Sequence, residues 1–187
     1  MNNLLVILFS LGIIQRISEM EVARRNRNWM REQGGYEVGK EHYPIIVGIH
    51  VLLFIGILVE SLFMRATPPS WWVLPFSIYL VTQVLRYWCI GTLGKYWNTR
   101  IWVVPDHAPK LKGPYRYMRH PNYVVVMIEI LVYPLIFGAI LTSISLSVVN
   151  TLIILLLRIP MEELALKEAT NYEEEMEEKN RFFPTWK

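Results

Sequence analysis

The chain has 187 residues, of which 53% are apolar and 19% are charged, and its mean hydropathy is +0.28. A soluble domain of this length does not usually have a positive mean hydropathy. Long stretches almost free of charge alternate with segments rich in arginine, lysine and glutamate. Composition therefore excludes a disordered chain, a disulfide-stapled secreted scaffold and an ordinary cytosolic enzyme. It predicts an all-α, polytopic membrane protein.

Apolar runs at the start of the chain predict the first three transmembrane helices. The segments 44–64 and 71–93 contain one charged residue each. Both are long enough to cross a bilayer, which takes about 20 residues. The segment 2–20 reaches spanning length if Arg16 extends its charged end to the interface, and it lacks the basic leader and cleavage site of a signal peptide.

The apolar run 122–157 predicts two further helices. It contains one charge, Glu129, and is too long for a single span. We expect spans over 122–141 and 143–158, joined by a hinge at 142–145. The chain would then have five spans.

Basic residues predict the orientation of these spans. Of the 19 lysines and arginines, all but Arg65 and Arg86 lie near the ends of the first and fifth spans or in the segments that follow the first, third and fifth spans. Because five alternating spans place these segments on one face, the positive-inside rule makes that face cytosolic. We expect a multi-pass cell-membrane protein with its N-terminus outside and its C-terminus inside. The net charge of +3 then gives no indication of nucleic-acid binding.

The sequence predicts one domain over 1–187, without a disulfide or a metal site. It contains no internal repeat and no low-complexity linker. Cys89 is the only cysteine, which excludes an internal disulfide and a thiolate metal cluster.

Ionisable residues inside the predicted spans are costly to bury and are candidates for function. Arg86 and Glu129 lie at similar depth, so they are plausible partners, either in an ion pair that fixes helix packing or in a ligand site. We expect Glu60 at the outer interface beside Arg65, and His50 as a hydrogen-bonded histidine of the core.

The segment 94–123 predicts an extended, turn-rich cytosolic loop, because its three prolines prevent a continuous helix. Arg116, Arg119 and His120 precede the fourth span, where a helix N-terminus and basic side chains would attract an anionic group. The alternative is that these basic residues only obey the positive-inside rule. After the last span, apolar residues at helical spacing predict an amphipathic cytosolic helix over 160–180, with Pro160 near its first turn.

Two motifs resemble one enzyme family. The segment 113–123, G-P-Y-R-Y-M-R-H-P-N-Y, is similar to the G-x-Y-x-x-x-R-H-P-x-Y signature of the isoprenylcysteine carboxyl methyltransferase family. Arg158 followed by Glu162 and Glu163 resembles the start of the family's C-terminal pattern. R-H-P-x-Y alone is shared with phospholipid N-methyltransferases and sterol reductases, whereas both motifs together are typical of this family. The segment 97–100 looks closest to a bacterial subgroup that O-methylates alkylpyrones or alkylresorcinols.

The resemblance implies S-adenosylmethionine at the cytosolic face and a lipophilic methyl acceptor that enters between the helices. It implies that Arg158 holds the methyl acceptor. Glu163 or His120 would serve as a general base if the acceptor were phenolic. Val125 replaces a glycine that the family usually has. The implied cofactor contacts are Arg100, His107, Ala108, Pro109, Lys110, Tyr115, His120, Pro121, Asn122, Tyr123 and Glu162.

Three other functions stay open at this point. An NADPH-dependent enzyme of the sterol-reductase type shares the R-H-P-x-Y region, and a phospholipid N-methyltransferase would use a different acceptor. A non-catalytic scaffold or small transporter would have no affinity for either cofactor.

Overall fold

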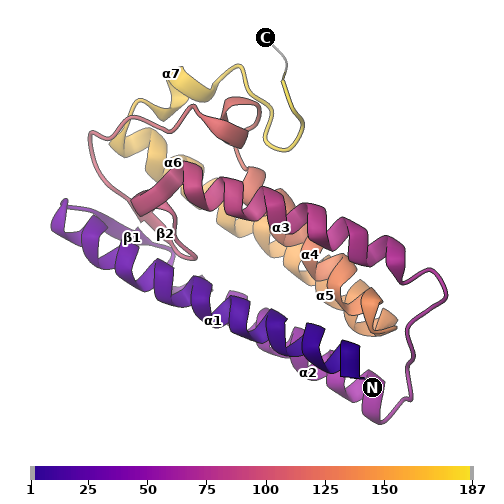
Figure 1. Cartoon of the computed structure of the whole chain (residues 1–187). Coiled ribbons are helices and arrows are strands. Elements are labelled where there is room, and N and C mark those ends of the chain that lie inside the picture. The colour runs from indigo at the N-terminus through magenta and orange to yellow at the C-terminus, as the bar shows by residue number, and fades with distance from the viewer. Residues whose placement is uncertain (1–2, 186–187) are drawn as a thin grey trace.

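The computed structural model describes residues 3–185 and consists mainly of helices that run alongside one another (Figure 1). Asn2, which belongs to the first predicted span, lies outside the described residues. The elements are, in chain order, α1 (Asn3–Glu32), β1 (Tyr36–Val38), η1 (Lys40–His42), α2 (Tyr43–Leu62), α3 (Val73–Leu93), η2 (Gly94–Tyr96), β2 (Ile101–Val103), η3 (Gly113–Arg116), α4 (Pro121–Ile136), α5 (Ile140–Ile153), η4 (Ile154–Arg158), α6 (Ile159–Ala169) and α7 (Tyr172–Met176).

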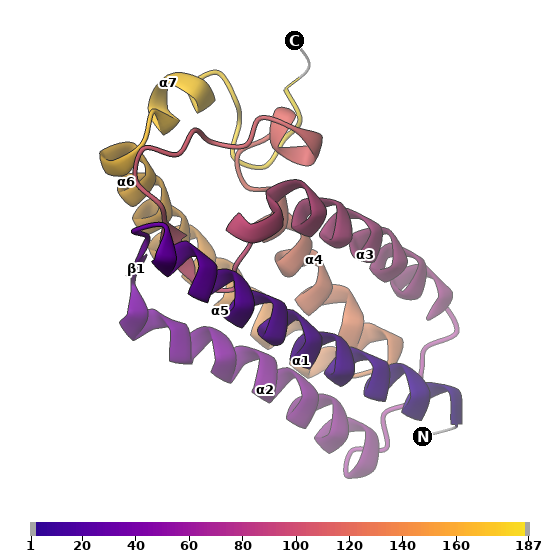
Figure 2. The same cartoon turned by 60° about the vertical axis from the view of Figure 1, so that its left-hand side comes forward.

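The helices α1 to α5 alternate in direction, so the segments that follow α1, α3 and α5 meet at one end of the bundle (Figures 1 and 2). This end carries β1, β2, α6 and α7, while the connection from α2 to α3 lies at the other end. The basic segments that were predicted to share a face therefore do lie together.

Three helical segments of the described chain are long and apolar enough to cross a membrane: Lys40–Leu62, Val73–Tyr96 and Ile140–Ala169. Pro121–Ile136 is a shorter apolar helix, and α1 is not among the three. These lengths and compositions are those of a membrane protein.

Apolar side chains from α1, α2 and α4 form the main core. Phe9, Leu53 and Ile130 are buried in it together with Phe137. Gly12 lets α1 and α4 approach closely, since a Cβ added there would lie 2.2 Å from the Tyr133 hydroxyl. Many apolar side chains on the outer faces of α2 and α3 are exposed, as expected for helices that face lipid.

The turn between α4 and α5 lies at residues 137–139, so the predicted hinge at 142–145 is wrong. Gly138 has a positive φ of 78°, and a Cβ there would lie 2.1 Å from the Thr67 carbonyl oxygen. Ser143 instead lies inside α5, where its hydroxyl donates to the Leu131 carbonyl at 2.6 Å. The Thr-Ser run was mistaken for a turn because such hydroxyls bond locally in both helices and turns.

Glu60, which was expected at the outer interface beside Arg65, caps the N-terminus of α5. Its carboxylate accepts hydrogen bonds from the backbone N–H groups of Leu141 at 3.1 Å and Thr142 at 2.6 Å. Only 6% of the residue is exposed. The first N–H groups of a helix have no partner within the helix and attract negative charge, which explains a buried carboxylate here.

We expect Glu60→Ala to lower the free energy of unfolding by about 1–2 kcal/mol, because it leaves the capped N–H groups unpaired. Thermal unfolding of the detergent-purified protein measures this loss. Glu168→Ala removes an exposed carboxylate from α6 and serves as the matched control. Equal destabilisation by the two substitutions would contradict the capping role.

The predicted irregular loop contains a short antiparallel sheet, which the all-α prediction missed. Strand β2 pairs with β1 so that Tyr36 lies opposite Val103 and Val38 opposite Ile101. Ile101 and Val103 are buried on one face of β2. β-Branched side chains at alternate positions favour a strand, but three residues are too few to distinguish a strand from a loop in the sequence.

The helix that begins with α5 continues through the π-helical turn η4 and α6 to Ala169. The predicted separate helix over 160–180 is therefore wrong at both ends. Pro160 lacks a backbone N–H and would clash in a regular helix interior, and the π-helical turn lies directly before it. Thr170 then takes an extended conformation, with its hydroxyl donating to the Leu166 carbonyl at 2.6 Å, and this ends the helix.

Candidate active site

A cavity of about 230 Å³ extends from the segment 94–120 and the start of α6 to side chains inside the bundle. Arg16, His50 and Arg86 are among its innermost lining residues. Most of the predicted site residues line it: Arg100, His107, Ala108, Pro109, Lys110, Tyr115, His120, Asn122, Tyr123, Arg158 and Glu162. Pro121 and Glu163 do not.

Arg158 stands at the end of the π-helical turn, and only 6% of it is exposed. One guanidinium nitrogen donates to the Thr99 carbonyl at 3.1 Å, and the guanidinium carbon lies 6.0 Å from the centre of the Tyr123 ring. A guanidinium has five N–H donors. Arg158 therefore has donors to offer a ligand in the cavity.

Glu162 and Tyr123 join α6 to the first turn of α4. The Tyr123 hydroxyl donates to the Glu162 carboxylate at 2.5 Å. A carboxylate has two oxygens and about four acceptor positions, so this bond leaves Glu162 able to accept from a ligand. Tyr123, Arg158 and Glu162 come from the two sequence motifs, and the structure brings them together.

His107 and Tyr96 form a flat aromatic pair at the loop side of the cavity. Their rings are stacked 3.8 Å apart with an interplanar angle of 6°. The Tyr96 hydroxyl lies 3.1 Å from His107 Nδ1, and the Lys110 ammonium lies 5.0 Å from the Tyr96 ring centre. Burial and the neighbouring Lys110 charge lower the pKa of His107, so the imidazole is neutral at pH 7.

Arg100 lines the cavity, but its guanidinium already has partners. It donates to Glu37 of β1 at 2.7 Å and stacks 3.8 Å from the centre of the Tyr43 ring. These contacts fix β2 against β1 and α2. The Arg100 side chain is therefore better placed to hold the loop than to exchange these partners for a ligand.

Glu163, predicted as a catalytic base, lies outside the cavity lining and holds the C-terminal segment in place. It bonds His120 Nε2 at 2.9 Å and Arg181 at 2.5 and 3.0 Å, and Arg119 lies 3.7 Å away. The backbone N–H groups of Arg119 and His120 also donate to the carbonyls of Asn180 and Arg181. These contacts join the family signature to the end of the chain.

Several buried polar atoms that line the cavity have no protein partner. They include His107 Nε2, Asn122 Oδ1 and the Tyr172 hydroxyl, and both amide atoms of Asn150. Burial raises the pKa of Tyr172, so its hydroxyl stays protonated and able to donate. Because buried polar groups are nearly always paired with protein or ordered water, these atoms are candidate contacts for a ligand or for bound water.

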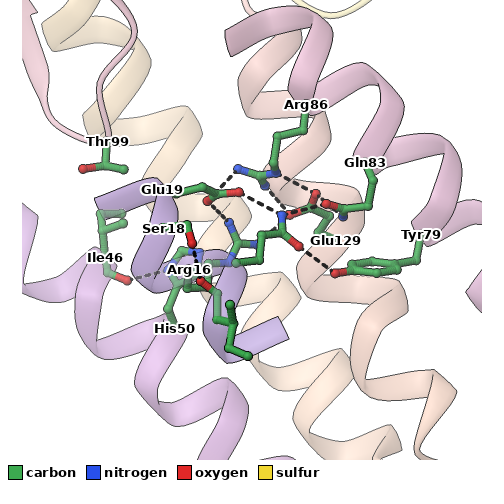
Figure 3. Close-up of polar contacts among 12 residues, drawn as sticks. Arg16, Ser18, Glu19, Ile46, His50, Tyr79, Gln83, Arg86, Thr99 and Glu129 are labelled. Carbon is green, nitrogen blue, oxygen red and sulfur yellow. Dashed lines mark hydrogen bonds and ion pairs between the residues drawn. The ribbon is translucent and has the colours of Figure 1, made fainter. Parts of the chain in front are cut away.

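Arg86 and Glu129 are in contact, as their matching depth predicted, and they belong to a larger network (Figure 3). Arg86 Nε donates to Glu129 at 2.8 Å, and a second guanidinium nitrogen also pairs with this carboxylate. Arg16 of α1 reaches Glu129 at 2.6 Å and Glu19 at 2.8 Å, while Arg86 lies 3.3 Å from Glu19. The two arginines and two glutamates, which come from α1, α3 and α4, thus neutralise one another's charges.

Sequence reasoning missed several cavity residues. Tyr96 gave no distinguishing signal, since aromatic residues are common near a membrane surface. Asn150 did give one, because it is an amide well inside the mainly apolar run 122–157. His50 was expected in the core, and its Nδ1 does bond the Ile46 carbonyl at 2.9 Å, but it also lines the cavity.

The sequence pattern of the isoprenylcysteine carboxyl methyltransferase family matches residues 73–168, about half of the chain. The chain belongs to this family. A Bacillus subtilis protein named Uncharacterized protein YpbQ is 43% identical over 162 residues, which cover 87% of this chain and 96% of that relative. An Uncharacterized protein of Haemophilus influenzae is 22% identical over 160 residues, 86% of this chain and 93% of that relative.

Membership of this methyltransferase family agrees with the apolar helices and with the position of the cavity. The matched region contains α3 to α6 and therefore both motifs whose residues line the cavity.

Proposed function

We propose that this protein transfers a methyl group from S-adenosylmethionine to an oxygen atom of a lipophilic acceptor at the cytosolic face of the cell membrane. One observation supports the proposal: a single cavity connects residues of both family motifs with the interior of the helix bundle. Its outer part is lined by His107, Glu162 and Tyr172. Its inner part is lined by the apolar Val126 and Ile154 and also by the charged Arg16 and Arg86. Such a cavity suits a polar cofactor beside an acceptor that has an apolar chain and an anionic group.

The residues at the outer part fit S-adenosylmethionine. The stacked Tyr96 and His107 rings offer a flat face to a planar base, and Asn122 Oδ1, which has no protein partner, can accept a hydrogen bond from its polar edge. Glu162 can accept hydrogen bonds from ribose hydroxyls or from an ammonium group. We propose cofactor contacts at these residues and at their neighbours Ala108 to Lys110, Tyr115 and Tyr123.

S-adenosylmethionine supplies a methyl group on a positively charged sulfur, and its carbon–sulfur bond breaks with the electron pair kept by sulfur as the acceptor oxygen forms the new carbon–oxygen bond. Arg158 would hold that oxygen as an anion, because a guanidinium is a planar, permanently charged donor. A carboxylate or an acidic hydroxypyrone is already anionic near pH 7 and needs no strong base. Positioning and exclusion of water would then supply most of the rate enhancement.

The contacts of Glu163 favour such an acidic acceptor over a phenol. A carboxylate that pairs with Arg181 and His120 is a weak base and does not line the cavity. We therefore propose Glu163 as a positioning residue that fixes His120, the residue before α4.

We further propose that α1 and α4 cross the membrane together with the three longer apolar segments. Both helices pack in the same core as α2, and Arg16 and Glu19 of α1 have their charges neutralised by α3 and α4. Five crossings place the basic segments on one side, which the positive-inside rule makes cytosolic. The cavity would then open toward the cytosol.

Calorimetry of the detergent-purified protein should show saturable binding of S-adenosylhomocysteine and none of NADPH. Glu162→Ala should weaken S-adenosylhomocysteine binding by about 10- to 100-fold, because it removes a charge-assisted acceptor worth roughly 1.5–3 kcal/mol. Glu168→Ala, an exposed carboxylate of the same helix, should bind normally.

Other results would support the alternatives. Binding of NADPH alone would favour a reductase, and binding of neither would favour a scaffold or transporter. If S-adenosylhomocysteine binds, radiolabelled methyl transfer to alkylpyrones, prenylcysteines and phosphatidylethanolamine separates O-methylation of a lipophilic acceptor from phospholipid N-methylation.

A further inference from the structure

Asn150 is a buried polar side chain beside apolar lining residues of the cavity. It lies in α5, and 1% of it is exposed. Both its amide nitrogen and its amide oxygen lack a hydrogen-bond partner, although the residue lines the cavity. An asparagine amide offers two donors and one acceptor oxygen. None of them is used within the described protein.

An unpartnered amide in this environment is unfavourable for the empty protein. Transfer of an amide into apolar surroundings is costly unless it forms hydrogen bonds. Among the other lining residues, Val126 and Ile154 offer no polar side-chain atom, and His50, whose Nδ1 bonds the Ile46 carbonyl, forms no hydrogen bond with the Asn150 amide. The amide therefore has no partner in the described contacts that would give it a structural role, whereas a ligand-binding role explains its burial.

Asn150 and Arg158 lie on the same helical stretch, on the side that lines the cavity. Eight residues separate them, roughly 12 Å along a helix axis, with Ile154 between them. Since α5 runs toward the end that carries α6 and α7, Asn150 is the deeper of the two. The cavity thus presents a cation near the cofactor residues and a neutral amide farther inside.

We propose that Asn150 is a specificity-determining residue that hydrogen-bonds a second polar group of the methyl acceptor, while Arg158 holds the reacting oxygen. This rests on the proposed function. The acceptor is then a lipid with a hydroxyl or carbonyl separate from the oxygen that is methylated. An acceptor whose inner part is only hydrocarbon would leave the Asn150 amide buried and unpaired, so it would bind more weakly.

Two long-chain carboxylic acids that differ by one hydroxyl test this recognition: 3-hydroxy-5-pentadecylbenzoic acid and 3-pentadecylbenzoic acid. Their affinities for the full-length protein in nanodiscs are measured by calorimetry without cofactor, which makes the test independent of methyl transfer. The wild-type protein should bind the hydroxy acid about five- to tenfold more tightly, the value of one net hydrogen bond. Asn150→Leu should reduce this preference to less than about twofold, while Thr151→Val, at a neighbouring position that does not line the cavity, should keep it.

Thermal unfolding of the same variants separates recognition from folding. Because Asn150→Leu removes an unpaired buried amide, the ligand-free variant should melt at or above the wild-type temperature. Lower melting temperatures of both Asn150→Leu and Asn150→Ala, compared with Thr151→Val, would show that the amide serves folding and would overturn the proposal. Equal affinity of wild type for the two probes, or binding of neither, would also overturn it. Loss of S-adenosylhomocysteine binding would instead refute the proposed function alone.

Discussion

Arg158→Ala should lower kcat/KM for methyl transfer by at least about 100-fold, while S-adenosylhomocysteine binding changes by less than about threefold. Removing one preorganised donor to a reacting oxygen typically costs roughly this factor. Arg158 is buried at the cavity and contacts Thr99 and Tyr123, and none of the described carboxylates forms an ion pair with it. Its charge is therefore available to the acceptor. Methyl-transfer kinetics and calorimetry on the same preparation measure the two quantities.

Two further variants make this test specific. Arg158→Lys keeps the charge but loses the planar pair of donors, so it should recover only part of the rate. Arg116→Ala removes an exposed arginine that does not line the cavity and should leave the rate unchanged. If Arg158→Ala weakened cofactor binding as much as it slowed turnover, Arg158 would be a cofactor contact and our assignment would be incorrect.

The membrane helices were predictable from the sequence because a bilayer imposes a simple length rule. The segments 44–64 and 71–93 agree closely with α2 and α3. The limits of α4 and α5 were not predictable from hydropathy alone. Gly138 and the Thr67 carbonyl determine where the chain turns, and this contact joins residues far apart in the sequence.

Side-chain partners were predictable only where depth in the bilayer limits the choice. Arg86 and Glu129 could be paired because each is the lone charge of its predicted span. The capping role of Glu60 was not foreseen, since its partners are backbone N–H groups of α5 and carry no sequence signal. Arg16 was expected to extend its charged end to the interface, so neither Arg16 nor Glu19 was expected to join Arg86.

The residues that line the cavity were predictable only where a sequence motif contained them. Arg158, Glu162 and Tyr123 lie together because the α4–α5 hairpin returns the chain to the same end of the bundle. Glu163 follows Glu162 directly, yet successive helical residues point in different directions. It therefore faces His120 and Arg181 and not the cavity.

Glu129→Leu should destabilise the protein by about 3–5 kcal/mol, the usual cost of leaving one charge of a buried pair without its partner. Glu129 is 1% exposed, accepts from Arg16, Arg86 and Gln83, and balances the two arginines together with Glu19. The variant would retain both arginines with one carboxylate. We expect a lower melting temperature and less folded protein in detergent.

The double variant Arg86→Met with Glu129→Leu should regain most of this stability, because it removes one positive and one negative charge together. Arg16 keeps its 2.8 Å contact with Glu19, and Gln83 keeps the 2.6 Å hydrogen bond from Gln15. Apolar replacement of a complete buried pair is often close to neutral. The double variant also distinguishes the two roles considered for the pair. A packing role predicts a folded variant that still transfers methyl groups, whereas a ligand role predicts a folded variant without activity. A double variant as unstable as Glu129→Leu alone would show that charge balance is not what holds α3 against α4.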